Sequence, residues 1–264
     1  MSPSTDSDRR PIRFHRDPEE PRLATLTVDR PPLNILALDT LAELEATLDA
    51  VAEDAPQVLL VRGGGGKAFS AGVAVEDHTP DKIGEMLERF HGALGTLRDL
   101  PSVNVAVVDG HCLGGGMELA AACDLVVAGP AARFGQPEIK LGCYPPYAAA
   151  LYPALLGSQR TFDLLLTGRA MDAAEAADAG FVTRLADEGE LEAEVDELVA
   201  SILTMSGAVT PLVKRSIRAG EGDTFRRALA ESERIYLEEL AETADMEEGI
   251  QAFLEKRRAE WRHR

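Results

Sequence analysis

The sequence has few cysteines and few aromatic residues, and it contains no long apolar run. Only three cysteines occur among 264 residues, Cys112, Cys123 and Cys143, and none of them has CxxC spacing. Neither a disulfide framework nor a zinc ribbon is therefore expected, and reduced thiols suit a cytoplasmic protein. A membrane-spanning helix needs a run of about 18 apolar residues, which the sequence does not offer.

Basic side chains are also scarce relative to acidic ones. The chain has 27 Lys and Arg against 45 Asp and Glu, a formal net charge of -18 and a pI near 4.7. Such a charge repels a nucleic-acid backbone and an anionic membrane surface, so neither is predicted as a partner. Any anionic ligand would require the few basic residues to be concentrated locally.

The order of apolar segments predicts a layered α/β protein. Residues 1–21 are polar and lack the apolar stretch of a signal peptide, so they are interpreted as a flexible N-terminal tail. Short strand-like runs then alternate with helical patterns across a core domain at 22–200. These runs are Leu23–Val28, Val58–Val61, Val103–Val108 and Leu125–Ala128. A C-terminal region at 201–264 is predicted to be mainly helical.

The segment around the three consecutive glycines Gly114, Gly115 and Gly116 carries the clearest chemical signal. Glycines allow a sharp turn and a close approach to a ligand, and a helix N-terminus presents N–H groups that suit a developing oxyanion. Glu118 follows Gly115 by about 4.5 Å of helical rise, so it can face the same ligand. This short segment can therefore supply both an oxyanion donor and a carboxylate.

Three stretches together resemble the crotonase (enoyl-CoA hydratase/isomerase) superfamily. Ala106–Ala120 and Ala132–Ile139 resemble its signature, and Lys67–Val73 resembles its first coenzyme A-binding loop. The resemblance implies a ClpP/crotonase-like α/β spiral of ββα units with a helical C-terminal trimerisation region. It also implies an acyl-CoA substrate that carries its own coenzyme A, no separate cofactor or metal, and a homotrimer or a dimer of trimers.

The resemblance implies roles for four positions in catalysis. The N–H groups of Val73 and Gly115 match the oxyanion hole, and Glu118 and Glu138 match the two acid/base carboxylates of the hydratases. Isomerases and hydrolases of the superfamily often keep only one carboxylate. The pair therefore favours an enoyl-CoA hydratase, a hydro-lyase that adds water to an enoyl thioester.

Further positions are expected to contact the substrate. The coenzyme A contacts implied by the resemblance are Lys67, Ala68, Phe69, Ala71, Gly114, Phe253 and Lys256. The acyl pocket is expected to include His78, Tyr144, Pro146 and Tyr147. Familiar short-chain hydratases have an acid and a glycine-rich turn where this sequence has Ala74 and Cys143–Ala148. The stretch Phe69–His78, together with Pro145–Tyr147, resembles the cyclohexa-1,5-diene-1-carbonyl-CoA hydratase branch, which acts on an alicyclic dienoyl thioester.

Other interpretations remain open from the sequence. Double-bond isomerisation and thioester hydrolysis use the same type of substrate, and a non-catalytic scaffold on the crotonase fold is a further alternative. Lys67 also fits a surface charge, and Phe253 and Lys256 fit an ordinary amphipathic helix. The histidines His78, His91 and His111 show no metal-ligand spacing, and a hydrogen-bonded structural role is the default for each.

Overall fold

The fold is built from successive strand–strand–helix units. The structure is a computed structural model, and it describes residues 10–65, 67–221 and 224–262. In each unit the first strand joins a large sheet and the second joins a small sheet. The units are β3 (Val58–Gly63), β4 (Ala68–Ser70) and α2 (Ile83–Asp99); β5 (Val103–Val108), β6 (His111–Leu113) and α3 (Gly115–Ala122); and β7 (Leu125–Ala128), β8 (Arg133–Gly135) and α4 (Pro146–Leu155). The predicted α/β spiral of ββα units is confirmed.

The large sheet has six strands in the order β1-β2-β3-β5-β7-β10. Its members outside the three units are β1 (Ile12–Arg16), β2 (Leu23–Val28) and β10 (Arg184–Leu185). Neighbouring strands run parallel, except that β1 is antiparallel to β2. The first four residues of β3 are all buried, because a parallel strand is covered on both faces.

The predicted N-terminal tail contains a strand, so the sheet begins earlier than the sequence analysis expects. Ile12 is the one buried residue of β1, and the next three residues are exposed. This pattern lacks the alternation that identifies a strand in a sequence. The pairing of Ile12 with Val28 and of Arg16 with Ala24 holds the segment in the sheet. Residues 1–9 of the predicted tail lie outside the described residues.

The small sheet brings two functional segments together. Its strand order is β4-β6-β8-β9, where β9 is Ala170–Asp172. Strand β6 leads through Gly114 into α3, and β8 leads into the short helix η3 (Glu138–Leu141). The amide of Gly114 donates to the carbonyl of Gly135 at 2.9 Å. This hydrogen bond joins the ends of the two strands, so the start of α3 lies beside the segment that carries η3.

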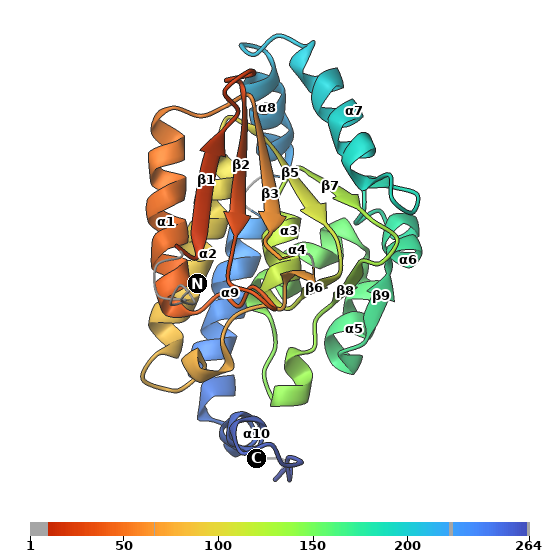
Figure 1. Ribbon diagram of the computed structural model, residues 1–264. Helices are drawn as coiled ribbons and strands as arrows, with labels where there is room; N and C mark the ends of the chain where they lie inside the picture. The colour runs from red at the N-terminus through yellow and green to blue at the C-terminus, as the bar shows by residue number, and fades with distance from the viewer. Residues whose placement is uncertain (1–9, 66, 222–223, 263–264) are drawn as a thin grey trace, which may run out of the picture.

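Helices α1 (Leu38–Glu53) and α2 pack against one another, and Figure 1 shows α1 along the left edge of the large sheet. One face of α2 is apolar and buried, including Met86, Phe90 and Leu94. Helix α2 begins at Ile83, and no side chain of the described residues caps its start. The carbonyl of Thr79 instead accepts hydrogen bonds from the amides of Lys82 and Ile83, in a turn that precedes the helix.

The C-terminal part of the chain is helical, as predicted. Its helices are α5 (Ser158–Thr167), α6 (Ala173–Asp178), α7 (Leu191–Leu203), α8 (Thr210–Glu221), α9 (Thr224–Glu238), η4 (Leu240–Glu242) and α10 (Ala244–Leu254). Helix α9 contacts α4 and α2, and α10 contacts η3 and η2 (Val75–Asp77). Figure 1 shows α10 at the bottom of the molecule, far from α7 and α8 at the top. The boundary predicted near residue 200 falls within α7.

The described ranges contain no helix with both the length and the apolar character needed to cross a membrane. The thiols of Cys112, Cys123 and Cys143 are free and buried. Burial raises the pKa of the Cys143 thiol to about 12, with a further contribution from the charge of Glu138. This thiol is therefore held protonated, and it does not provide a nucleophile for the neighbouring cavity.

Candidate active site

A cavity of about 640 Å³ lies where the first loop, α2, the start of α3, η3 and α10 meet. Strands of the small sheet hold the first loop and the start of α3 at the cavity, and α10 of the C-terminal region also lines it. Most of the cavity wall is apolar, and three carboxylates line it: Glu76, which is exposed, and the more shielded Glu118 and Glu138. This arrangement is typical of a substrate pocket with a few placed polar groups.

Two backbone amides lie close together at the inner wall. A Cβ atom placed on Gly115 would come within 2.9 Å of Val73 Cγ2, and one placed on Gly72 would come within 3.1 Å of the Gly115 nitrogen. The first loop also pairs with Leu36. In this pairing the amide of Ala74 donates to the Leu36 carbonyl at 3.2 Å, and the amide of Val73 is not used. Gly115 is the first residue of α3, where an N–H has no carbonyl one turn earlier. The first loop and the start of α3 therefore meet at Val73 and Gly115.

Glu118 projects from the first turn of α3 and is 3% exposed. Its Oε1 atom accepts a hydrogen bond from the amide of Ala148 in α4, at 2.8 Å. Burial raises the pKa of the Glu118 carboxyl, and the nearby His91 imidazole and the amides of Ala148 and Tyr147 act against that rise. The carboxyl is thus buried but retains partners that favour its ionised form.

Glu138 is the first residue of η3 and is half-buried at the cavity. A Cβ atom on Gly114 would lie 2.5 Å from Glu138 Oε1, so this carboxylate touches the backbone at the start of α3. Burial, followed by the charge of Glu118, raises the pKa of Glu138 to about 8. The two carboxyls therefore differ in environment, and Glu138 is the one that retains a proton near neutral pH.

A buried amide supports Glu138 from behind. One orientation of the Gln136 amide gives hydrogen-bond partners to both its oxygen and its nitrogen. In that orientation the oxygen accepts from Tyr152 Oη at 2.8 Å, and the nitrogen lies 3.2 Å from each Glu138 carboxylate oxygen. Gln136 and Tyr152 are both fully buried. Their contacts restrict the rotation of the Glu138 side chain.

Comparison with known proteins identifies the family. The model of the enoyl-CoA hydratase/isomerase family matches residues 19–264. This chain belongs to the enoyl-CoA hydratase/isomerase family. The cyclohexa-1,5-dienecarbonyl-CoA hydratase of Thauera aromatica is 36% identical over 92% of the chain and 93% of that protein. The crotonyl-CoA hydratase of Syntrophomonas wolfei is 34% identical over 91% of the chain and 95% of that protein.

Solved structures agree with this family assignment. An enoyl-CoA hydratase/isomerase from Xanthobacter autotrophicus Py2 superposes with a TM-score of 0.83 at 28% identity, covering 93% of each chain. An enoyl-CoA hydratase from Mycobacterium avium subsp. paratuberculosis superposes with a TM-score of 0.82 at 27% identity, covering 95% of this chain and 98% of the other. The crotonase fold predicted from the sequence is therefore confirmed.

Several contact residues implied by the family resemblance do line the cavity. They are Ala71, Gly114, Phe253, His78, Tyr144 and Pro146. His78 Nδ1 lies 2.9 Å from the carbonyl oxygen of Ala74, and burial lowers the pKa of its imidazole. Tyr144 Oη donates to the carbonyl of Ser232 at 2.6 Å, which fixes the ring against α9.

Other implied contacts lie outside the cavity wall. Lys67 and Lys256 are exposed, and Ala68 and Phe69 are buried in β4. Their contact with coenzyme A stays a prediction. Tyr147 is 1% exposed and packs between His91 and Phe225, so it supports the wall from behind.

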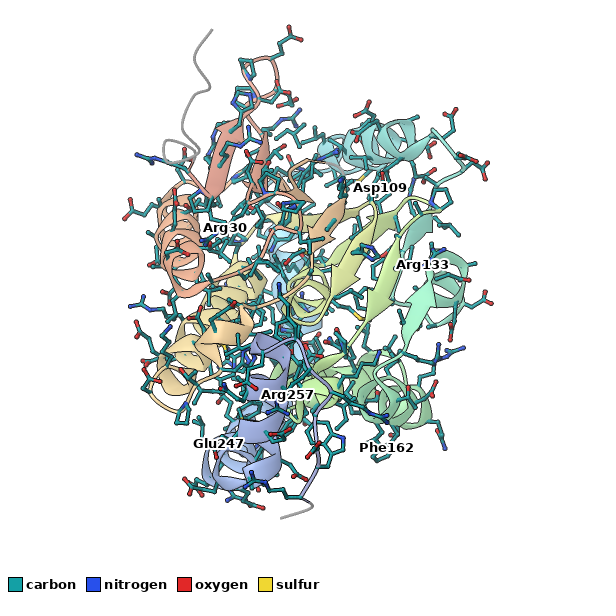
Figure 2. All side chains as sticks on the ribbon, turned by 60° about the horizontal axis from the view of Figure 1, so that its bottom comes forward. Arg30, Asp109, Arg133, Phe162, Glu247 and Arg257 are labelled. Carbon is teal, nitrogen blue, oxygen red and sulfur yellow. The ribbon has the colours of Figure 1, made fainter. Side chains whose placement is uncertain are left out.

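The cavity also contains residues that the sequence analysis did not select. Arg257 follows α10 and lines the cavity, and Figure 2 shows it beside that helix. Lys140, in η3, is exposed at the same cavity. Arg257 is paired with Glu248 and Glu255, so its charge is partly neutralised, and Lys140 supplies the second cation at the cavity. Arg257 directly follows Lys256 in the C-terminal stretch, which is the one sequence signal that pointed to it.

Proposed function

We propose that this protein is an enoyl-CoA hydratase that adds water to an enoyl- or dienoyl-CoA thioester. The observation that carries the proposal is the pair Glu118 and Glu138, which face one cavity beside two amides and differ in proton affinity. Two curated relatives of the family are named as hydratases of this type. An isomerase or a thioester hydrolase needs only one such carboxylate.

The geometry supports distinct roles for the two carboxyls. Glu118, whose ionised form has partners, accepts a proton from the attacking water as its oxygen bonds to the β-carbon. Glu138, whose pKa is raised to about 8, donates its proton to the α-carbon. The negative charge that develops on the thioester oxygen is held by the amides of Val73 and Gly115. One water is consumed, and the proton on Glu118 restores that of Glu138 through solvent.

The substrate carries coenzyme A, and its anionic part is proposed to lie near Lys140 and Arg257. The implied contacts Lys67, Ala68, Phe69 and Lys256 lie beyond the wall of the acyl cavity, where the nucleotide end of a long thioester can extend. Phe253, which is 50% exposed at the cavity, is proposed to pack against the pantetheine arm.

The acyl group is proposed to be an alicyclic dienoyl thioester in preference to a long linear chain. Pro146 begins α4 at the cavity and has no N–H to donate, and Tyr144 narrows the same side. The relative from Thauera aromatica, named as a cyclohexa-1,5-dienecarbonyl-CoA hydratase, supports this choice of substrate.

A homotrimer or a dimer of trimers is proposed from exposed apolar side chains on α8 and on the segment that leads into it, defined here as the α8 surface. Its members are Met205, Val209, Leu212, Val213 and Ile217, each more than half exposed. Exposed apolar groups gathered in this number are typical of a protein–protein interface.

A core domain followed by a C-terminal helical region at 201–264 is proposed as the domain division, and the core includes β1, so it begins before residue 22. A cytoplasmic location is proposed from the free thiols.

The test is a panel of enoyl- and dienoyl-CoA thioesters. Hydration removes the conjugated double bond, so ultraviolet absorbance should fall in a saturable manner without release of free thiol. Release of free coenzyme A would indicate a thioesterase instead. A shifted double bond in a product of unchanged mass would indicate an isomerase, and inertness towards the whole panel would favour a scaffold.

A further inference from the structure

A histidine and a glutamate that belong to neither the oxyanion hole nor the carboxylate pair meet beside the cavity. His91 projects from α2, lines the cavity, and has a side chain only 5% exposed. Its Nδ1 atom lies 2.5 Å from Glu233 Oε1, which comes from α9. A carboxylate acceptor fixes the proton of an imidazole on the nitrogen that faces it. Glu233 therefore sets both the tautomer and the ring orientation of His91.

The other ring nitrogen is the informative one. His91 Nε2 is buried and has no hydrogen-bond partner within the described ranges. The ring is confined by Phe90 and Tyr147, whose centroids lie 5.8 Å and 5.9 Å away, so it has little room to turn toward another acceptor. A buried polar atom without a partner is costly, and its retention at a substrate cavity points to a function there.

Glu118 is the carboxyl on which this imidazole acts. Among the charged side chains around Glu118, His91 is the one that opposes the effect of burial on its pKa. The ionisable groups facing His91 are Glu233 from α9, Tyr147 from α4 and Glu118 from α3. Arg98, also on α2, lies over the ring of Phe225 at 4.8 Å and extends its charge toward Tyr147. Glu138 lines the same cavity.

We propose that Glu233 and His91 form a positioning pair that keeps Glu118 ionised as the proton acceptor in water addition. Glu233 holds the His91 ring by its Nδ1 atom, and His91 and Glu118 line the same cavity, so the imidazole is fixed where it can act on the Glu118 carboxyl. His91 acts through Glu118 and is a positioning residue. This inference rests on the proposed hydratase function, because it concerns the group that accepts the proton from water.

A purely structural explanation makes a different prediction. The His91–Glu233 contact also joins α2 to α9, and these helices pack against one another. If joining the helices were its whole role, its loss would lower stability and leave the pH dependence of catalysis unchanged. The two explanations are separated by measuring kcat/KM as a function of pH together with thermal unfolding.

The variants are His91→Gln, which keeps a polar side chain without an ionisable group, and Glu233→Leu, which removes the acceptor. The matched control is Glu231→Gln on the same helix, since the Glu231 side chain is 59% exposed and pairs with Arg234. The substrate is the enoyl- or dienoyl-CoA thioester that the wild-type enzyme hydrates fastest.

Loss of the imidazole removes the side chain that lowers the pKa of Glu118, so the acidic limb of kcat/KM should move to higher pH. A displacement of about one pH unit lowers kcat/KM about tenfold at pH values below both limbs, and the loss should shrink as the pH rises. KM should change little. Both variants should show this displacement, their combination should add little to it, and the control should match wild type.

An acidic limb identical to wild type in both variants, whatever their melting temperatures, overturns the proposal and leaves a helix–helix contact. A Glu118→Gln variant measured in parallel separates this failure from that of the proposed function. If Glu118→Gln hydrates the substrate at the wild-type rate, Glu118 is not the proton acceptor and the proposed mechanism fails. If Glu118→Gln is inactive while the His91 variants keep the wild-type profile, only the positioning pair is wrong.

Discussion

Gly114→Ala tests the contact between the start of α3 and Glu138. Gly114 has φ 54° and ψ -132°, a conformation that residues with a Cβ atom rarely adopt. Forcing alanine into such a region costs on the order of 1–3 kcal/mol. For a chain of this size the melting temperature should fall by about 2–12 °C. The protein should still fold, because the cost is smaller than the stability of a typical domain.

The effect on catalysis should be larger than the effect on stability. The new methyl group would meet Glu138 Oε1 at 2.5 Å, so the carboxylate must retreat by about 1 Å to reach ordinary contact. A displacement of about 1 Å in a catalytic group costs roughly 10²-fold in rate. We therefore expect kcat for hydration to fall about 10²-fold in a folded protein, measured by the loss of enoyl-thioester absorbance.

Gly84→Ala provides the matched control. Gly84 lies in α2, where an added Cβ atom meets nothing within 4 Å and alanine favours the helix. This variant should keep wild-type kcat and gain slightly in melting temperature. If Gly114→Ala is folded and as active as Gly84→Ala, Glu138 does not act from the position that the structure gives it.

Three further predictions follow from buried charge and exposed apolar surface. The pKa of Glu138 is raised to about 8 from an ordinary value of 4.5, so the folded state favours the protonated acid. The free energy of unfolding of the wild type therefore falls as the pH rises across that interval. Glu138→Gln should therefore gain in melting temperature relative to wild type as the pH rises through that interval, and a pH-independent difference would contradict the burial of this carboxyl. Lys214 Nζ lies 2.7 Å from Asp124 Oδ2 and donates to the Ser102 carbonyl at 2.8 Å. Lys214→Met should lower the free energy of unfolding in urea by about 2–4 kcal/mol. The loss should be smaller than that for a buried charge with no partner, because Arg218 still pairs with Asp124, and an unchanged stability would contradict a stabilising Lys214–Asp124 pair. Ile217 is 63% exposed on the α8 surface, so Ile217→Asp should convert the proposed oligomer to monomers in light scattering. A wild-type protein that is already monomeric would contradict the oligomer proposal.

The sequence predicts those features that depend on local spacing. The apolar face of α2 follows from helical periodicity, and the adjacency of Gly115 and Glu118 follows from their separation by three residues in one helix. The first loop and the glycine segment were expected to share a site through a family resemblance. The structure supports this with the contact between Val73 and the Gly115 position.

Features that depend on long-range pairing could not be predicted. His91 and Glu233 are 142 positions apart, and no local pattern indicates that α9 packs against α2 at that point. His91 alone reads as an ordinary helical histidine. Strand β1 was not predicted because it too depends on a long-range contact. It is held by pairing with β2, and Ile12 is its one buried residue, so it shows no alternating pattern. Local propensity is a weak guide where tertiary contacts decide the structure.

The most direct test of the proposed function is the rate of water addition in Glu118→Gln, in Glu138→Gln and in the double variant. Each single substitution keeps the size of the side chain but removes its ionisable group, so each should lower kcat about 10²–10⁴-fold. The double variant should lose far less than the product of the two effects, because the two groups act as a unit in the addition of one water. Full hydration activity in either single variant would contradict the two-carboxylate mechanism.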